Sequence, residues 1–170
     1  MTVCGRILVA GIGNIFHGDD AFGVEVARAL SGRPQPETVN VVDFGIRSYD
    51  LAYALTSDYD TVLLVDAVSR GQPPGTLYVI EPDLEELGRS EEPVGGGHSL
   101  KLVDVLQMAR MLGTVRGKVL VVGCEPAGLE DDRGDMQLSE SVRAAIPQAV
   151  ELVESLIRRS AGRQSEKTTA

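Results

Sequence analysis

Residues Thr61–Val68 read TVLLVDAV and form the most apolar segment of the chain that is typical of a strand. Six of its eight residues are apolar, and its length and valine content are typical of a strand that is buried on both faces. Such strands occur in mostly parallel sheets that helices cover on both sides. The stretch therefore predicts an α/β protein.

Other short apolar stretches alternate along the chain with segments of helical period. Further strands are predicted at 6–11, 39–44, 76–80 and 118–123. Helices are predicted at 20–30, at 49–55, from about 99 to 112, and at 142–157, where Pro147 marks a kink or the true start. This alternation predicts a three-layer, doubly wound α/β fold, in which helices cover both faces of a twisted sheet of about five strands.

The connection between the third and fourth predicted strands is too short for a parallel crossover. It spans only seven residues, SRGQPPG at 69–75, whereas a crossover needs about a dozen or more. The strand at 76–80 should therefore lie antiparallel to the strand at 61–68. Residues 81–97 are predicted to form a long loop, and loops of this length are usually functional or mobile. We expect one domain over residues 1–160 and a disordered tail over 161–170.

Composition restricts the possible partners. The chain has 170 residues and a net charge of −9, which disfavours binding to nucleic acids and to anionic membranes. No apolar run approaches the roughly 18 residues of a membrane helix. The two cysteines, Cys4 and Cys124, form neither a disulfide framework nor a Cys-x-x-Cys metal site. We predict a cytoplasmic protein that binds neither nucleic acid nor membrane.

The first strand is followed by Gly11-Ile12-Gly13, which opens like a dinucleotide-binding loop. The third glycine of that motif would fall at Phe16 and is missing. The acidic pair Asp19-Asp20 would also repel phosphates at the start of the following helix. A nucleotide-binding enzyme is thus a disfavoured alternative, and a thermal shift with ATP or NAD would detect it. Helix capping can occupy one of the two aspartates and leave the other for a ligand.

Three candidate ligands lie far apart in the sequence: Asp20 after the first strand, Asp66 near the end of the third, and His98 after three glycines. If the first and third strands are neighbours, these side chains can converge at one edge of the sheet. Two carboxylates and one imidazole form an open site for a borderline divalent ion. Each residue also has a structural interpretation: a helix cap, a buried hydrogen bond and a solvent-facing loop position, respectively.

Two other residues could take part in chemistry. His17 lies close to Asp20 and could be a further ligand, but a surface position is the favoured interpretation. Cys124 is the only plausible thiol nucleophile, and a role as a small buried apolar residue is favoured.

The segment GIGNIFHGDDAFG, at residues 11–23, resembles the N-terminal signature of the hydrogenase maturation proteases. That signature is Gly-x-Gly-Asn followed by an acidic pair and a glycine. The resemblance continues through VVDFGIRSYDLAYAL, LLVDAV, GGGHS and VVGCEP, and it covers residues 6–159. Each motif alone is weak, but their order over nearly the whole domain is specific.

This resemblance implies an endopeptidase that removes the C-terminal extension of a nickel–iron hydrogenase large-subunit precursor after nickel insertion. It assigns metal sensing and catalysis through the metal to Asp20, Asp66 and His98, with nickel carried by the substrate and not held permanently. It also implies that the segment Asp43-Phe44-Gly45 recognises the substrate. Phe44 and Ile46 depart from the commoner Asp-Gly-Gly-Thr pattern, so the hydrogenase served stays open. A nickel-checking chaperone without proteolytic activity is the alternative, because the sequence offers no separate nucleophile.

Overall fold

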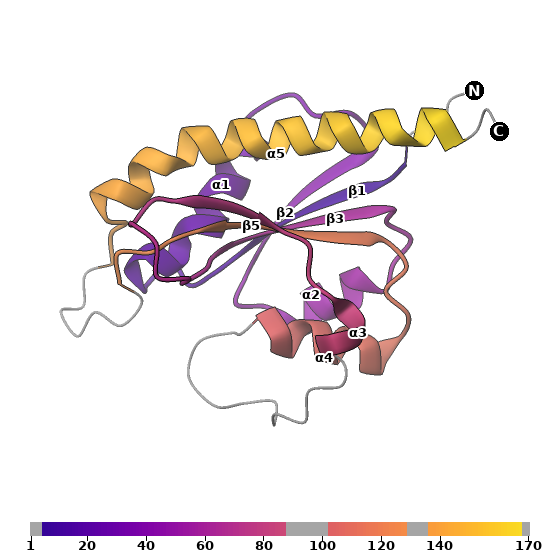
Figure 1. The fold of residues 1–170 in the computed structure, drawn as a ribbon, viewed down its shortest axis with the longest axis horizontal. Helices are drawn as coiled ribbons and strands as arrows, with labels where there is room; N and C mark the ends of the chain where they lie inside the picture. The colour runs from indigo at the N-terminus through magenta and orange to yellow at the C-terminus, as the bar shows by residue number, and fades with distance from the viewer. Residues whose placement is uncertain (1–4, 88–101, 129–135, 168–170) are drawn as a thin grey trace.

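The computed structural model describes residues 5–87, 102–128 and 136–167, which form a sheet with helices on both sides (Figure 1). In chain order the elements are β1 (Ile7–Ile12), η1 (Gly18–Ala21), α1 (Phe22–Ser31), β2 (Val39–Gly45), α2 (Ser48–Leu55), β3 (Thr61–Ala67), β4 (Leu77–Ile80), α3 (Leu84–Leu87), α4 (Leu102–Leu112), β5 (Lys118–Cys124) and α5 (Glu140–Lys167). The alternation predicted from the sequence is thereby confirmed.

The strands form one sheet in the order β2-β1-β3-β5-β4. All pairs are parallel except β4 with β5. The chain leaves β1 toward β2 on one side and then continues to β3 on the other side of β1. The carboxyl ends of β1 and β3 are therefore the topological switch point, where doubly wound sheets bind their ligands.

The alternation of side chains along the strands divides the apolar core into two layers. On β3, Leu63 and Val65 pack with α1 and α5, whereas Val62 and Leu64 pack with α2 and α4. Figure 1 shows the long α5 across one face of the sheet and α2, α3 and α4 on the other. The predicted three-layer arrangement is confirmed.

The fourth strand runs in the predicted direction beside a different neighbour. β4 is antiparallel to the other strands, but it pairs with β5, as in Val79 opposite Val122, because β5 lies between β3 and β4. The turn before β4 is held against the end of β5. The Gly75 amide donates to the Glu125 carbonyl, and the Glu125 amide donates to the Thr76 carbonyl, each at 2.8 Å.

Other sequence predictions need correction. Pro147 lies inside α5 and is not its start, because the helix begins at Glu140 after Ser139, whose hydroxyl accepts from the Val142 amide at 3.4 Å. α5 continues to Lys167, whereas the sequence predicted a disordered tail from residue 161. The predicted loop at 81–97 contains α3, and its residues 88–97 lie outside the described ranges. Among the described helices, none has the length and apolar character needed to span a membrane.

Candidate functional site at the carboxyl edge of the sheet

Two aspartates lie at the switch point between β1 and β3. Asp66 is the sixth residue of β3, and Asp20 belongs to η1, which follows β1 and contacts β3. They are near enough that the charge of Asp20 acts on the carboxyl group of Asp66. The convergence of these two residues, expected from their places after neighbouring strands, is present in the structure.

Asp66 is buried, and its environment opposes its negative charge. Burial is the main reason why the pKa of Asp66 lies well above its usual range, and the charge of Asp20 adds to the effect. A hydrogen bond from the Ala67 amide to Asp66 Oδ1, at 2.9 Å, acts in the other direction. A cation between the two carboxylates would remove their repulsion and replace the lost hydration.

Asp20 is held in place by the loop that leaves β1. Its Oδ2 accepts a hydrogen bond from the Asn14 amide at 3.0 Å. Gly13, the preceding residue, has a φ of +136°, and a Cβ atom there would lie 1.7 Å from the Asp20 carbonyl oxygen. Only glycine lets the loop approach η1 this closely, so Gly13 determines where Asp20 sits.

Asp19 has a structural role that differs from the predicted cap of its own helix. η1 has no side-chain cap, and Asp19 instead binds the segments that follow β5. Its buried carboxylate accepts from the Ala127 amide at 2.8 Å, the Ser139 amide at 2.7 Å and the Ser139 hydroxyl at 3.0 Å. The two acidic residues thus divide their roles: Asp19 joins η1 to the start of α5, and Asp20 faces β3.

The close packing that a third glycine at residue 16 would provide comes from Gly23, the last residue of the segment GIGNIFHGDDAFG. A Cβ on Gly23 would lie 2.0 Å from the Val65 carbonyl oxygen and 2.3 Å from the Ile12 carbonyl oxygen. A Cβ on Gly11 would lie 2.4 Å from the Gly23 carbonyl oxygen. The first turn of α1 therefore rests on the backbones of β1 and β3. This contact brings η1, and Asp20 with it, against β3.

The segment Asp43-Phe44-Gly45 ends β2 beside the same loop. Gly11 pairs with Asp43, but Ile12 pairs with Gly45, so Phe44 is an extra residue in a bulge. Gly45 has a φ of +54°, which favours glycine, and its carbonyl accepts from the Gly13 amide at 3.1 Å. The segment predicted to recognise the substrate thus adjoins the loop that positions Asp20.

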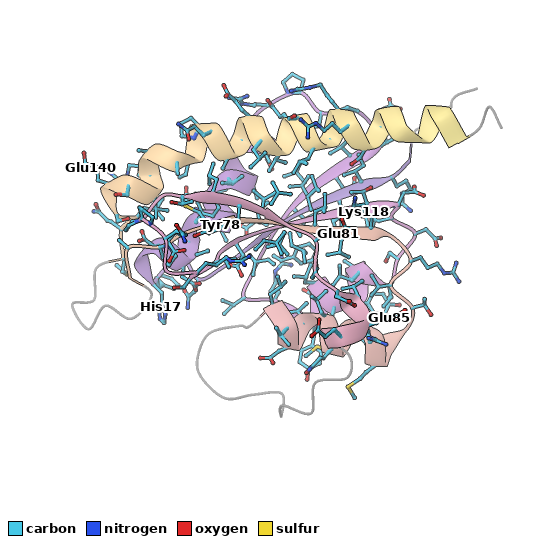
Figure 2. All side chains as sticks on the ribbon, in the orientation of Figure 1. His17, Tyr78, Glu81, Glu85, Lys118 and Glu140 are labelled. Carbon is cyan, nitrogen blue, oxygen red and sulfur yellow. The ribbon has the colours of Figure 1, made fainter. Side chains whose placement is uncertain are left out.

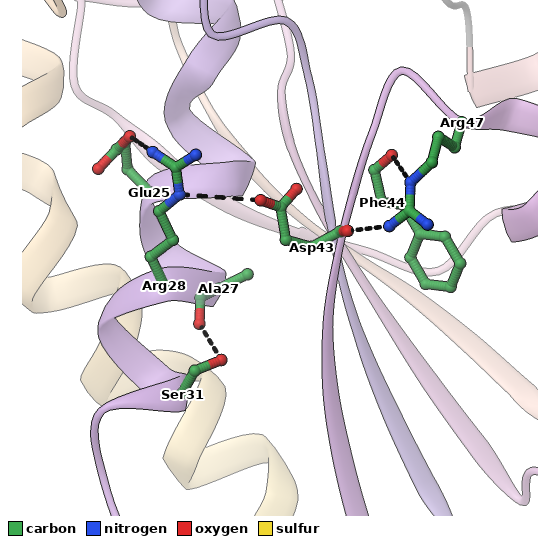
Figure 3. A network of polar contacts seen from close by, with 7 residues as sticks. All are labelled: Glu25, Ala27, Arg28, Ser31, Asp43, Phe44 and Arg47. Atoms are coloured by element: carbon green, nitrogen blue, oxygen red, sulfur yellow. Dashed lines mark hydrogen bonds and ion pairs between the residues drawn. The ribbon is translucent and has the colours of Figure 1, made fainter.

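Two arginines fix the conformation of this segment (Figure 3). Arg28 on α1 places its Nε 3.7 Å from Asp43 Oδ2. Arg47 donates to the carbonyl oxygens of Asp43 and Phe44, and its guanidinium lies 5.7 Å from the centre of the Phe44 ring. Sequence reasoning missed both arginines, because nothing in their spacing indicates that they bind the end of β2.

Of the two histidines, His17 lies within the described residues and His98 does not. His17 is exposed, as predicted, and Figure 2 shows it at the end of the molecule where Glu140 begins α5. His98 lies outside the described residues. Within the described part of the chain, no three side chains of the metal-binding types gather into a site. Asp20 and Asp66 are therefore the part of the predicted triad that the structure places.

Cys124 and Glu125, at the end of β5, have structural environments. Cys124 is fully buried, and burial, with smaller contributions from Asp19 and Glu125, raises its pKa to about 11, which makes it a poor nucleophile. Glu125 was missed by the sequence analysis. Its buried carboxylate accepts from the Arg70 amide at 2.8 Å, the Gly71 amide at 3.1 Å and the Tyr78 hydroxyl, and so closes the turn before β4.

Comparison with known proteins identifies the family. A family model described as hydrogenase maturation protease matches residues 24–156, a range that includes Asp66 and His98 and begins after Asp20. The chain is similar to the hydrogenase 2 maturation protease of Escherichia coli K12, at 34% identity over 157 residues, 91% of this chain and 92% of that protein. It is also 32% identical over 160 residues to the hydrogenase expression/formation protein HupD of Rhizobium leguminosarum bv. viciae, covering 90% and 74% of the two chains.

Solved structures agree in fold. The hydrogenase maturating endopeptidase HybD from Escherichia coli superposes with a TM-score of 0.73 at 33% identity, covering 91% of this chain and 93% of its own. The hydrogenase 2 maturation peptidase from Thaumarchaeota archaeon SCGC_AB-539-E09 gives 0.63 at 35% identity, covering 89% and 97%. This chain therefore belongs to the hydrogenase maturation protease family and is a hydrolase that acts on peptide bonds.

Proposed function

We propose that this protease removes the C-terminal extension of a nickel–iron hydrogenase large-subunit precursor after nickel has been inserted, and that it recognises the nickel through Asp20, Asp66 and His98. The observation that carries the proposal is the carboxylate pair at the switch point, where Asp66 is buried and its burial, together with the charge of Asp20, raises its pKa. The nickel is part of the substrate, so the protease recognises it during binding and does not hold it permanently.

The donor set fits a divalent ion of this kind. Asp20 uses Oδ2 and Asp66 uses Oδ1 in backbone hydrogen bonds, so the second oxygen of each carboxylate can bind a metal ion. These hydrogen bonds also orient the carboxylates before the substrate arrives. Two carboxylates with one imidazole suit a borderline ion and leave coordination positions for groups of the precursor.

His98 belongs to the proposal because of its place in the sequence relative to α4. It precedes the first residue of α4, Leu102, by four positions. α4 packs on the face of the sheet that carries Val62 and Leu64, and the alternation along β3 directs Asp66 toward that face. Figure 1 shows α4 beginning toward the end of the sheet where β3 terminates. Four extended residues span at most about 14 Å, so the sequence ties His98 to the start of α4.

The residues of this chain act by binding and orientation. Asp20, Asp66 and His98 hold the nickel-bearing end of the precursor, while the segment Asp43–Gly45, next to Gly13, receives the peptide that leads to the scissile bond. Nickel supplies a Lewis acid that polarises the scissile carbonyl or a bound water. A precursor without nickel is not oriented and is therefore not cut.

The experiment follows the mass of a purified nickel-loaded precursor during incubation with Asp20→Asn, Asp66→Asn or His98→Gln variants. We expect each change to slow processing by more than about tenfold, since even residues that only support metal ligands are worth 10–100-fold. Asp58→Asn is the matched control, because Asp58 is exposed and its ion pair with Arg116 spans 4.0 Å. The wild-type protease should leave nickel-free precursor intact.

Normal processing by all three variants would refute the assigned ligands. A stable complex whose two masses never change would instead favour the nickel-checking chaperone that does not cut.

A further inference from the structure

We infer that the outward side of α2 is a docking surface for the folded body of the large-subunit precursor, distinct from the site that receives its C-terminal segment. The surface, called here the α2 outer surface, consists of Ile46, Tyr49 and Tyr53. The occupant to which we commit is an uncharged, apolar patch on the precursor. This inference rests on the proposed function, because the precursor is the substrate named there.

The α2 outer surface is apolar where a surface helix is normally polar. Ile46 is 63% exposed, Tyr49 72% and Tyr53 69%. Tyr49 and Tyr53 are four residues apart on α2 and so share one side of the helix, and Ile46 lies two residues before the helix begins at Ser48. The opposite side of α2 is apolar as well and lies in the core through Leu51, Ala52 and Leu55. The buried side of α2 thus contributes to the core, whereas the outward side exposes two large aromatic rings that the core does not need.

This surface continues toward the carboxylate pair. Ile46 directly follows Gly45, whose carbonyl is bound by the Gly13 amide at 3.1 Å. The loop after Gly13 carries Phe16, which is 64% exposed, and leads into Asp20. Exposed apolar residues therefore adjoin the predicted entry of the substrate on the β1 and β2 side. A precursor whose C-terminal segment reaches Asp20 must bring its folded body against this region.

Charge favours an uncharged partner over a basic one. Arg47 and Asp50 are the only charged residues between 46 and 55, and they pair at 3.4 Å. Arg47 also donates to the Phe44 carbonyl at 3.2 Å. The α2 outer surface is therefore neutral on a chain whose net charge is −9. An apolar patch can cover it without burying an unpaired charge, whereas a basic partner would find better sites elsewhere.

A second copy of this chain is the less suitable occupant. A copy docked on the α2 outer surface would also lie over Gly45 and the loop at Gly13, and would obstruct the approach to Asp20. Tyrosine is the expected residue for contact with a different protein, since its ring contributes a large apolar area while its hydroxyl stays hydrated.

The test uses the whole protease and the whole precursor. A Tyr49→Gln/Tyr53→Gln double variant removes both rings and keeps a good helix former at each position. Val79→Thr is the matched control, because Val79 is an exposed apolar residue on β4, at the opposite edge of the sheet from β2. Binding is measured with nickel-free precursor, which is not cut, and KM and kcat are measured with nickel-loaded precursor.

We expect the double variant to weaken binding of the nickel-free precursor by about tenfold or more, as removal of central interface tyrosines does, and to raise KM while kcat stays unchanged. The control variant should match wild type in all three quantities. Wild-type binding by the double variant, or a loss confined to kcat, would overturn the inference. So would a wild-type protein that is dimeric in solution and becomes monomeric in the double variant.

The outcomes separate this inference from the proposed function. Asp66→Asn should still bind nickel-free precursor with wild-type affinity while losing the ability to process. If Asp66→Asn processes normally, the proposed metal ligands are wrong, whatever the tyrosine variants show. If it fails to process and the tyrosine variants bind normally, only the docking surface is wrong.

Discussion

Replacing Gly23 with alanine should test how the fold positions the candidate site. Gly23 lies in the first turn of α1, directly over the ends of β1 and β3. An added Cβ would lie 2.0 Å from the Val65 carbonyl oxygen and 2.3 Å from the Ile12 carbonyl oxygen. Both obstacles are backbone atoms of central strands, so neither can rotate away. The helix itself has to move.

The size of the effect follows from this geometry. Contacts below 3.0 Å are essentially never seen, so the 2.0 Å contact requires a shift of 3.0 − 2.0 = 1.0 Å. Overpacking of this kind costs about 3 kcal/mol at the upper end of its usual range, and the preference of helices for alanine over glycine returns about 1 kcal/mol. We therefore expect the free energy of unfolding to fall by about 2 kcal/mol. Processing should fall by about a hundredfold, because a 1 Å displacement of Asp20 relative to Asp66 disturbs the pair.

Urea denaturation measures the first quantity, and the rate of precursor processing measures the second. Gly32→Ala is the control at the other end of α1, where φ is −79° and an added Cβ would meet nothing closer than 3.6 Å. That variant should be as stable as wild type or slightly more stable. If Gly23→Ala unfolds at the same urea concentration as Gly32→Ala, the close packing of α1 on β1 and β3 is not what positions η1.

Three further predictions concern single side chains. Asp19→Asn should lower the free energy of unfolding by about 2–4 kcal/mol, because the buried carboxylate of Asp19 accepts three hydrogen bonds. The exposed control Asp58→Asn should change the free energy of unfolding little, and equal urea midpoints for the two variants would contradict the role of Asp19. Asp66→Asn should stabilise the metal-free protein at neutral pH. The pKa of Asp66 is raised on folding, so the folded state binds the extra proton, and wild type loses stability as pH rises from the unfolded value near 3.8 through the folded value. The advantage of the variant should therefore vanish in acid, and a pH-independent difference would argue against burial as the cause. Glu125→Gln should loosen the turn before β4 and speed hydrogen exchange of the Arg70 and Gly71 amides, whereas unchanged exchange would show that the carboxylate is not what protects them.

The helices, the strands and their arrangement in layers could be predicted from the amino-acid sequence, because they follow from local periodicity. The continuous apolar run around Leu63 indicated a strand buried on both faces, and the seven-residue connection at 69–75 predicted an antiparallel β4. The sequence also singled out Asp66, since a carboxylate inside such a run needs a special environment. These are properties of short segments. The length of a connection and the cost of burying a carboxylate can both be judged without knowing which other segments pack nearby.

Which distant segments contact one another became known from the folded structure. In the structure, β5 lies between β3 and β4. Asp19 binds Ser139, whereas Asp20 faces β3. Gly23 makes the close contact between α1 and the sheet. α5 also continues to Lys167, where the composition had suggested a disordered tail. Such outcomes depend on contacts between residues far apart in the sequence, such as Val62 with Val119 or Asp19 with Ser139, or on the space available to a single Cβ atom. Neither quantity has a signal in local sequence, because both arise when the layers pack.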